Sequence, residues 1–332
     1  MNGRRAVALF SGGLDSRLAA LLVARQGIAV TLVHFVTGFA HVKGLAESRN
    51  SRISFSRKFG LELREISIED EFLGIIENPR FGWGKNLNPC VDCKIMMLRK
   101  ARTLLSEIEA DFIVSGEVLA QRPMSQHGPA LRLIEKEGGL TGLLLRPLSA
   151  RLLPSTIPEE QGWIDRDRLG GFSGRSRKPQ MNLARIIGLA EYPPPAGGCL
   201  LTDRRFCDKL RDVLLRGSLT PAEVRLLKVG RHFRLSDRVK LVVARDEKEG
   251  FMLQELSRPD DWLFYPASKK GPLALARGLV SEAEETTAAR LVGFYSRFPD
   301  GVPRVVVVPG GEEEYSVIVP PLSKGEMEVM RL

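Results

Sequence analysis

The chain has 332 residues, 43% hydrophobic and 27% charged, a composition typical of folded globular proteins with room for two or three domains. No apolar run approaches the roughly 20 residues of a membrane span, and four cysteines are too few for a disulfide framework, so we expect a cytoplasmic protein with no membrane partner. The net charge is +9, and because residues 218–332 hold 17 basic and 17 acidic residues, the excess lies before them and favours a phosphate-rich partner such as RNA.

Short apolar runs alternate with helical patterns in the first half of the chain. Buried strands are predicted at residues 5–10, 28–36, 61–67 and 111–116, and helices at residues 16–26, 45–59 and 91–109. Apolar strands separated by helices are typical of parallel sheets that are covered on both faces. We therefore predict an α/β fold over residues 1–170, with a doubly wound, mainly parallel sheet and a ligand site beyond the carboxyl ends of its strands.

The pattern changes after this first domain. Residues 171–217 consist of proline-bounded pieces and a final helix, which Thr202 or Asp203 can cap. Residues 218–332 alternate short strands with helices, one of them at residues 281–295. They predict a smaller C-terminal α+β domain.

The segment SGGLDS, residues 11–16, connects the first strand to the first helix. An ordinary βα turn is one explanation, because glycine allows positive φ and serine or aspartate caps helices. The other is a phosphate cradle at a helix N-terminus, although the segment has no Walker A lysine. In that case the anion-binding residues are Ser11, Gly12, Gly13, Leu14, Asp15 and Ser16. Phosphate repels a carboxylate unless a cation lies between them, so we infer Mg²⁺ at Asp15.

Other polar loops are expected to meet the same crevice. Gly116 and Glu117 follow a strand, and we expect them to help bind ATP or Mg²⁺, while Arg122 and Gln126 face a phosphate or a target base. A phosphate of RNA or ATP is also the expected contact of three clustered basic residues, Arg175, Arg177 and Lys178. For each loop the alternative is a solvated charge with no ligand.

Two aromatic residues and a histidine near the crevice have two interpretations each. Phe81 and Trp83 either stack on an unpaired RNA base or anchor their loop to the core. His34 is expected to be a buried part of the nucleotide pocket, in preference to a catalytic base.

Three of the four cysteines suggest sulfur or metal chemistry. Cys90 and Cys93 have C-x-x-C spacing at a predicted helix start, where the helix dipole favours thiolates, and Cys199 follows a run of prolines and glycines. The residues alone allow a structural zinc site, a disulfide-forming pair with a persulfide carrier, or a [4Fe–4S] cluster with one open iron. Cys207 falls on an apolar helix face and is predicted to be core.

These motifs resemble known families. The strand followed by SGGLDS resembles the PP-loop ATP pyrophosphatases, which have the adenine nucleotide alpha hydrolase-like fold. That resemblance implies cleavage of ATP between the α- and β-phosphates and adenylation of a carbonyl oxygen. Across residues 6–216 the chain resembles short relatives of tRNA 4-thiouridine synthase, in the segments GKNLNPCVDCK, SGEVLAQRPMSQ, LRPLSA, SGRSRKPQM and YPPPAGGCLLTD.

The second resemblance implies the sulfur chemistry. Cys90, Cys93 and Cys199 would ligate a [4Fe–4S] cluster, with a persulfide or disulfide mechanism at Cys93 and Cys199 as the alternative. With Asp15, Cys93 and Cys199 form the expected catalytic set. ATP and Mg²⁺ are further expected cofactors, and tRNA and a sulfur donor, either sulfide or a cysteine-desulfurase persulfide, are the expected partners. A dimer is one of the oligomeric states considered.

The segment KVGRHFRLSDRVK opens a region that resembles, more loosely, the RNA-binding domain of the NFACT family. Its Arg231 and Arg234 are predicted to contact RNA. The sequence therefore predicts an ATP-dependent tRNA sulfurtransferase that forms 4-thiouridine at position 8. The alternatives are 2-thiouridine-type thiolation, sulfur transfer to a small molecule, and a non-catalytic RNA-binding nucleotide sensor.

Overall fold

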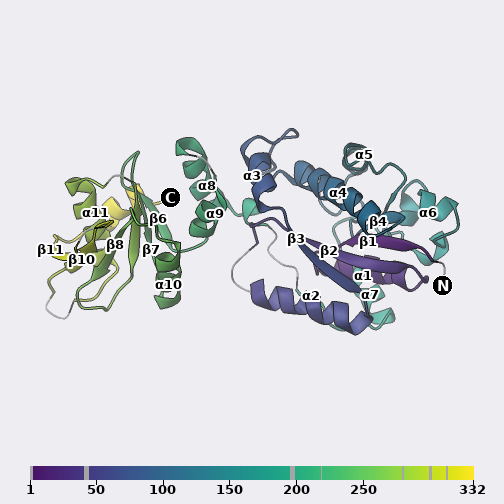
Figure 1. The fold of residues 1–332 in the computed structure, drawn as a ribbon, viewed down its shortest axis with the longest axis horizontal. Coiled ribbons are helices and arrows are strands. Elements are labelled where there is room, and N and C mark those ends of the chain that lie inside the picture. Colours follow the sequence, from purple (N-terminus) through teal and green to yellow (C-terminus); the bar gives the residue numbers. More distant parts are fainter. Residues whose placement is uncertain are drawn as a thin grey trace. The chain divides into compact units, whose positions relative to one another are not determined.

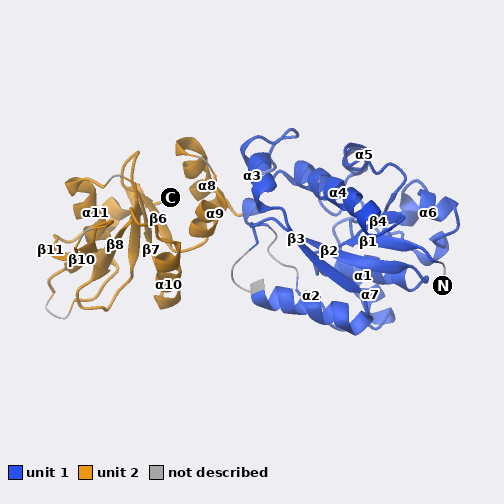
Figure 2. Ribbon diagram, in the orientation of Figure 1, with its two compact units in different colours: residues 1–202 blue, residues 203–332 orange. Residues whose placement is uncertain are grey.

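The computed structural model describes residues 3–40, 45–194, 199–217, 219–278, 280–298, 301–311 and 313–332. It divides into two compact units, unit 1 at residues 1–202 and unit 2 at residues 203–332 (Figure 2). In the described ranges, no helix is both long enough and apolar enough to cross a membrane.

Unit 1 is built on a five-stranded parallel sheet (Figure 1). Its strands are β1 (Arg5–Leu9), β2 (Ala29–Val36), β3 (Glu62–Ser67), β4 (Phe112–Ser115) and β5 (Leu144–Leu145), in the order β3-β2-β1-β4-β5. Every neighbouring pair is parallel. This parallel sheet confirms the predicted fold class. The strands β1 and β4 are neighbours near the middle of the sheet, so the loops that follow them start side by side.

Helices cover both faces of this sheet. They are α1 (Leu14–Ala24), α2 (Leu45–Phe59), α3 (Glu69–Glu77), α4 (Cys90–Glu107), α5 (Gly128–Glu137), α6 (Ile157–Glu160) and α7 (Lys178–Ile186). Because side chains alternate along a strand, Ala6 and Ala8 of β1 join the core under α1 and α7, and Val7 joins the core under α4 and α5. The first two predicted strands and the helix at residues 45–59 lie where expected. The helix predicted at 16–26 begins two residues earlier, at Leu14, directly after Gly13. The helix predicted at 91–109 begins one residue earlier, at Cys90, directly after Pro89.

Unit 2 is an antiparallel α+β unit, as predicted. Its strands are β6 (Arg231–Arg234), β7 (Lys240–Val243), β8 (Trp262–Pro266), β9 (Ala274–Arg277), β10 (Arg304–Val308) and β11 (Tyr315–Ile318), in the order β11-β10-β8-β9-β7-β6. Its helices are α8 (Arg204–Arg216), α9 (Pro221–Leu227), α10 (Glu247–Leu256), α11 (Glu282–Phe294) and α12 (Lys324–Met330). Asp203 caps α8 by accepting a hydrogen bond from the Phe206 amide at 2.8 Å.

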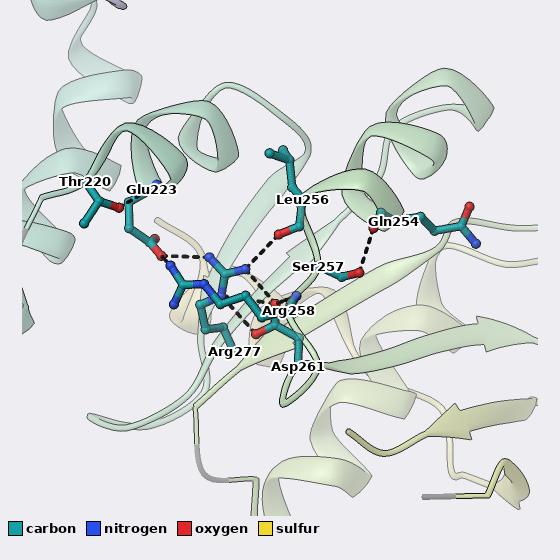
Figure 3. Close-up of polar contacts among 8 residues, drawn as sticks. All are labelled: Thr220, Glu223, Gln254, Leu256, Ser257, Arg258, Asp261 and Arg277. Atoms are coloured by element: carbon teal, nitrogen blue, oxygen red, sulfur yellow. Dashed lines mark hydrogen bonds and ion pairs between the residues drawn. The ribbon is translucent and has the colours of Figure 1, made fainter. Parts of the chain in front are cut away.

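An ion network around the buried Asp261 fastens α9 to the sheet of unit 2 (Figure 3). The Arg277 guanidinium on β9 donates to Glu223 of α9 at 2.7 Å and to Asp261 at 2.6 Å. It also donates to the Leu256 carbonyl at 3.0 Å, while Arg258 donates to the same Glu223 oxygen at 3.0 Å. The buried carboxylate of Asp261 therefore has a charged partner, which is the condition for a buried charge to be tolerated. Glu223 and Arg277 are half-buried and Arg258 is exposed.

Candidate nucleotide and sulfur site

The loop between β1 and α1 has the geometry of an anion cradle. Gly12 has a φ of 82°, which favours glycine. Ser11 Oγ accepts a hydrogen bond from the Gly13 amide at 3.3 Å, and Ser16 Oγ donates to the Gly13 carbonyl at 2.9 Å. The N-cap residue Gly13 supplies no side-chain cap, so the amides of the first turn of α1 stay available for an anion.

Two buried arginines that the sequence reasoning missed hold this loop from behind. Arg17 Nε donates to the Gly12 carbonyl at 2.7 Å, and its terminal nitrogen donates to Ser51 Oγ of α2 at 2.7 Å. Arg52 packs so closely that a Cβ on Gly12 would lie 2.7 Å from its Cγ, and Glu65 of β3 pairs with its guanidinium at 2.8 Å. The loop is thus anchored to α2, which no local motif signals.

The end of β4 abuts the start of α1. A Cβ on Gly116 would lie 2.7 Å from the Ser16 amide nitrogen, so only glycine fits there. The next residue, Glu117, is 3% exposed and pairs with Arg146 at 3.2 Å and with Lys94 at 3.9 Å. Burial raises the pKa of Glu117, but the charges of Lys94 and Arg146 outweigh it and leave the pKa below its usual range. Glu117 is therefore an ionised carboxylate held between two cations.

The two carboxylate oxygens of Asp15 differ in their hydrogen bonding. Gln121 Nε2 donates to Asp15 Oδ2 at 2.9 Å, whereas Asp15 Oδ1 is buried without a hydrogen-bond partner. A buried carboxylate oxygen without a donor is costly, and a cation would satisfy it. The residue thus fits the Mg²⁺ ion predicted from the sequence, because carboxylate oxygen is a preferred ligand of that ion.

Cys90, Cys93 and Cys199, the three cysteines singled out from the sequence, come from two segments that are joined by hydrogen bonds. Cys90 and Cys93 occupy the first turn of α4, where Asn88 Nδ2 lies 3.3 Å from Cys90 Sγ. Residues 195–198 are outside the described ranges, but Cys199 follows them, and two hydrogen bonds attach the segment after it to the loop before α4. The Asn86 side chain donates to the Thr202 carbonyl at 2.7 Å, and the Leu87 amide to the Leu201 carbonyl at 3.3 Å.

The surroundings of Cys93 raise its pKa. Burial raises it to about 12, Lys94 opposes the rise, and both Cys199 and Cys90 add to it. Three neighbouring thiols are a donor set that suits zinc or an iron–sulfur cluster. Among the residues that the structure describes, however, no group of three or more His, Cys, Asp or Glu side chains has the geometry of a metal site.

The predicted phosphate-binding loops differ in exposure. Arg122, Arg175 and Lys178 are exposed. Arg177 Nε and Gln126 Oε1 are buried without partners, as is the Oε1 atom of Gln180 on α7. These unpaired atoms come from the same two loops that pack together through the bridge between Leu119 and Ser173.

The two aromatic residues and the histidine singled out from the sequence differ in their exposure and contacts. Trp83 is 46% exposed and its Nε1 donates to the Ile76 carbonyl at 3.1 Å, while Phe81 is half-buried. His34 is half-buried beside the Phe10 carbonyl, 2.9 Å from its Nδ1. Cys207 is fully buried on α8, which confirms its assignment to a core.

The basic residues singled out in unit 2 are engaged within that unit. Arg231 donates to the Ala244 carbonyl at 3.1 Å and lies 4.7 Å from the centre of the Tyr295 ring. Arg234 Nε donates to the buried Asp212 at 3.0 Å. Both guanidinium groups therefore already have partners.

Exposed basic side chains of unit 2 gather around the loop between β8 and β9. Lys269 and Lys270 lie in this loop, the Arg297 amide donates to the Lys270 carbonyl at 3.1 Å, and the Ala267 amide donates to the Arg304 carbonyl at 2.9 Å. We call Lys269, Lys270, Arg297 and Arg304 the loop patch; all four side chains are exposed.

One cavity is lined by none of the residues of the loop at 11–16. Its volume is about 620 Å³, and Asn78, Phe81, Asp92 and Met96 are among its lining residues between α3 and α4. A second cavity, of about 320 Å³, lies behind Arg17. Asp15, Glu117 and the cysteines line neither cavity.

Comparisons with known proteins agree with the motifs. Residues 2–151 match the family model of the thiamine biosynthesis protein (ThiI), and residues 230–330 match that of the NFACT protein RNA binding domain. A tRNA sulfurtransferase from Desulfurococcus amylolyticus is 31% identical over 144 residues, which cover 43% of this chain and 29% of that protein. One from Pseudomonas syringae is 33% identical over 150 residues, covering 43% and 28%.

Solved structures give more distant similarities. A 4-thiouridine synthetase in complex with RNA and bound ATP has a TM-score of 0.43 and 22% identity over 61% of this chain and 46% of that one. A U34-tRNA thiolase from Methanococcus maripaludis with its [4Fe–4S] cluster has a TM-score of 0.36 and 18% identity over 59% and 61%.

The chain spans less than a third of the length of the curated relatives it matches. The segment that holds Arg175, Arg177 and Cys199 lies outside both matched ranges. Within the matched ranges the resemblance drawn from the motifs is confirmed. Residues 2–151 are similar to the ThiI family model, and residues 230–330 are similar to the model of the NFACT protein RNA binding domain.

Proposed function

We propose that this protein is an ATP-dependent tRNA sulfurtransferase that adenylates a uridine carbonyl and replaces its oxygen with sulfur. The product we favour is 4-thiouridine at tRNA position 8. The matched relatives are tRNA sulfurtransferases. The match to the ThiI family model, at residues 2–151, includes the segment SGGLDS and both Cys90 and Cys93.

The observation that carries the proposal is the short path between the phosphate loop and the thiols. Gly116 packs against Ser16 of the PP-loop, and the next residue, Glu117, pairs with Lys94, the neighbour of Cys93. A reaction that activates a base with ATP and then attacks it with sulfur needs both groups at one crevice. This chain of contacts supports that arrangement.

In the first step, the uridine carbonyl oxygen attacks the α-phosphorus of ATP and pyrophosphate leaves. Ser11, Ser16 and the amides of Gly12 to Leu14 would hold the departing pyrophosphate through hydrogen bonds and the dipole of α1. Asp15 would hold Mg²⁺, which neutralises developing charge on the phosphate oxygens. Glu117 pairs with Lys94 and Arg146, but its Oε1 is buried without a hydrogen-bond partner, as Asp15 Oδ1 is, so it would help to hold Mg²⁺ or to position ATP.

In the second step, a sulfur nucleophile attacks the activated carbon, and AMP leaves with the original oxygen. A cluster held by Cys90, Cys93 and Cys199 would supply sulfide at its open iron. In the alternative, a persulfide on Cys93 or Cys199 transfers its outer sulfur, and the two thiols close to a disulfide that a reductant must reopen. Cys90 and Cys93 share the first turn of α4, and hydrogen bonds tie the segment after Cys199 to the loop before α4, so the chain supports either route.

The tRNA partner is proposed from basic surfaces in both units. In unit 1, Arg122, Arg175 and Lys178 are exposed and would contact phosphates near the target base, with Arg177 among them. In unit 2, we move the proposed contact from Arg231 and Arg234, which have partners, to the loop patch. Exposed cations bind RNA by neutralising phosphates and releasing counterions.

Nucleoside mass spectrometry tests the proposal. Protein purified without oxygen is incubated with a tRNA transcript, ATP, Mg²⁺ and sulfide, beside an Asp15→Asn control. We expect 4-thiouridine, AMP and pyrophosphate with the natural chain and none with the control. 2-Thiouridine would select the alternative thiolation, and RNA binding without ATP cleavage would select the nucleotide sensor.

The visible and electron paramagnetic resonance spectra of the same preparation separate the two sulfur routes. Absorption of an iron–sulfur cluster is expected for the favoured route. An iron-free protein that thiolates tRNA when a cysteine-desulfurase persulfide replaces sulfide as the donor would support the persulfide route instead.

A further inference from the structure

Three side chains from three separate segments form a line of hydrogen bonds that ends at the PP-loop. Gln180 on α7 donates from Nε2 to Gln121 Oε1 at 3.2 Å. Gln121, in the loop after β4, donates from Nε2 to Asp15 Oδ2 at 2.9 Å. We call these three residues the amide relay.

The direction of the relay follows from the chemistry of the amide group. A glutamine side chain has one acceptor end and one donor end. Because Gln180 occupies the acceptor end of Gln121 with a donor, the donor end of Gln121 is directed at Asp15. Without Gln180, Gln121 Oε1 loses its donor and the side chain of Gln121 is held less firmly against Asp15.

The backbone holds both glutamines in place. Gln180 is fully buried, and it follows Pro179 in the first turn of α7, which packs against α1. The Gly174 amide donates to the Leu119 carbonyl at 2.8 Å, so the loop of Gln121 and the segment before α7 are joined. The two amides can therefore act as fixed supports.

Resting on the proposed function, we propose that Gln121 and Gln180 are positioning residues that orient the Asp15 carboxylate for Mg²⁺ bound with ATP. Gln121 acts directly on Asp15, and Gln180 acts only through Gln121. The relay leaves Asp15 Oδ1 buried and unpaired, which is the atom that a cation would meet. Supports of this kind fix ligand orientation, and their loss typically weakens metal binding roughly 10- to 100-fold.

The test measures binding, so it is independent of sulfur transfer. Mg²⁺ is titrated by calorimetry into the full chain saturated with α,β-methylene-ATP, for the natural protein and for Gln121→Met, Gln180→Met and the double variant. Methionine keeps the length and volume of glutamine and removes both hydrogen-bonding ends. Thermal unfolding of each variant checks that it folds.

The double variant distinguishes a relay from two independent packing contributions. We expect Gln121→Met to weaken Mg²⁺ binding by roughly 10- to 100-fold, and Gln180→Met to weaken it less. Adding Gln180→Met to Gln121→Met is expected to change Mg²⁺ affinity no further, because Gln180 has lost the group through which it acts. Gln26→Met is the matched control, since it removes two hydrogen bonds to Asp165 on another side of unit 1.

Two results overturn the inference while leaving the proposed function intact. One is Mg²⁺ affinity that stays natural in Gln121→Met. The other is a double variant whose loss equals the product of the two single losses. If the natural chain binds no Mg²⁺ with the analogue, the relay has nothing to orient and the proposed ATP chemistry falls with it.

Discussion

The crevice of unit 1 and the basic segment of unit 2 were both singled out by sequence, yet their charged side chains differ in what they contact. At the crevice, Asp15 Oδ1 and Arg177 Nε are buried with no partner in the chain. In the basic segment, Arg231 and Arg234 have carbonyl, carboxylate and ring partners. A buried polar atom without a partner calls for an explanation, and at Asp15 a bound cation would supply one. The partners of Arg231 and Arg234 indicate structural roles, although His232 Nδ1 and Lys240 Nζ of the same segment are also buried without a hydrogen-bond partner.

The largest expected effects separate the two half-reactions of the crevice. Asp15→Asn removes a charge that would hold Mg²⁺, so we expect AMP release in the presence of tRNA to fall about 100- to 1,000-fold.

Cys93→Ala keeps the PP-loop, so we expect pyrophosphate release to continue while thiouridine formation is lost. Pyrophosphate and thiouridine are measured in parallel, with Cys207→Ala as the control thiol that is buried elsewhere. Equal loss of both activities in Cys93→Ala would contradict the division.

Glu117→Gln tests the buried ion network that links the PP-loop to the cysteine helix. Lys94 and Arg146 lose a counter-charge, and we expect the free energy of unfolding to fall by about 3–5 kcal/mol, measured with urea. Because the pKa of Glu117 is lowered in the folded chain, its stabilisation is present above the ordinary carboxyl range and is lost as the pH falls through the lowered pKa.

Urea unfolding repeated over a range of pH values checks the prediction for Glu117→Gln. The stability difference between the natural chain and Glu117→Gln should therefore shrink in acid. A difference that grows as the pH falls would contradict the account. Glu62→Gln, at an exposed pair with Arg64, is the control and is expected to cost below about 1 kcal/mol.

Gly116→Ala tests the close approach of β4 to α1. The added Cβ would meet the Ser16 amide at 2.7 Å, and because both neighbours are backbone, we expect a loss of about 1–3 kcal/mol in unfolding free energy. Displacement of the PP-loop should also weaken binding of α,β-methylene-ATP in calorimetry. Gly74→Ala in α3 is the control, because no atom lies within 4 Å of its added Cβ. Natural nucleotide affinity in Gly116→Ala would contradict the packing argument.

The smallest effect is expected at the loop patch. A variant with Lys269→Ala, Lys270→Ala and Arg297→Ala should lower the slope of log affinity for tRNA against log salt by about 3, with little change in stability. The comparison variant, Arg231→Gln with Arg234→Gln, should unfold at lower temperature and keep the natural slope. Filter binding measures the slopes and thermal melting measures the stabilities. If the loop-patch variant kept the natural slope and the variant of Arg231 and Arg234 lowered it, the RNA contact would lie in the basic segment.

The sequence predicted what depends on local spacing. SGGLDS after an apolar strand was enough to place Gly12 and Gly13 at the start of α1, and the C-x-x-C pair lies in the first turn of α4 as expected. Asp203 was also predicted as a cap of the following helix. Each of these features is decided by residues that are neighbours in the chain.

What the sequence did not predict depends on contacts between distant segments. Nothing near Arg17 indicates that it binds the Gly12 carbonyl, and nothing near Gln180 indicates a bond to Gln121. The same reason explains Arg234: its charge suggested an RNA contact, but folding brings Asp212 to it from α8. A charge pattern alone does not tell whether the chain itself will neutralise the charge.

The most direct test of the central claim follows the oxygen that sulfur replaces. A tRNA carrying ¹⁸O at the O4 atom of uridine 8 is incubated with the anaerobic protein, ATP, Mg²⁺ and sulfide, and the products are weighed by mass spectrometry. The account predicts 4-thiouridine at that position and AMP that has gained one ¹⁸O atom. Unlabelled AMP, or ATP cleavage that leaves the labelled uridine unchanged, would contradict it.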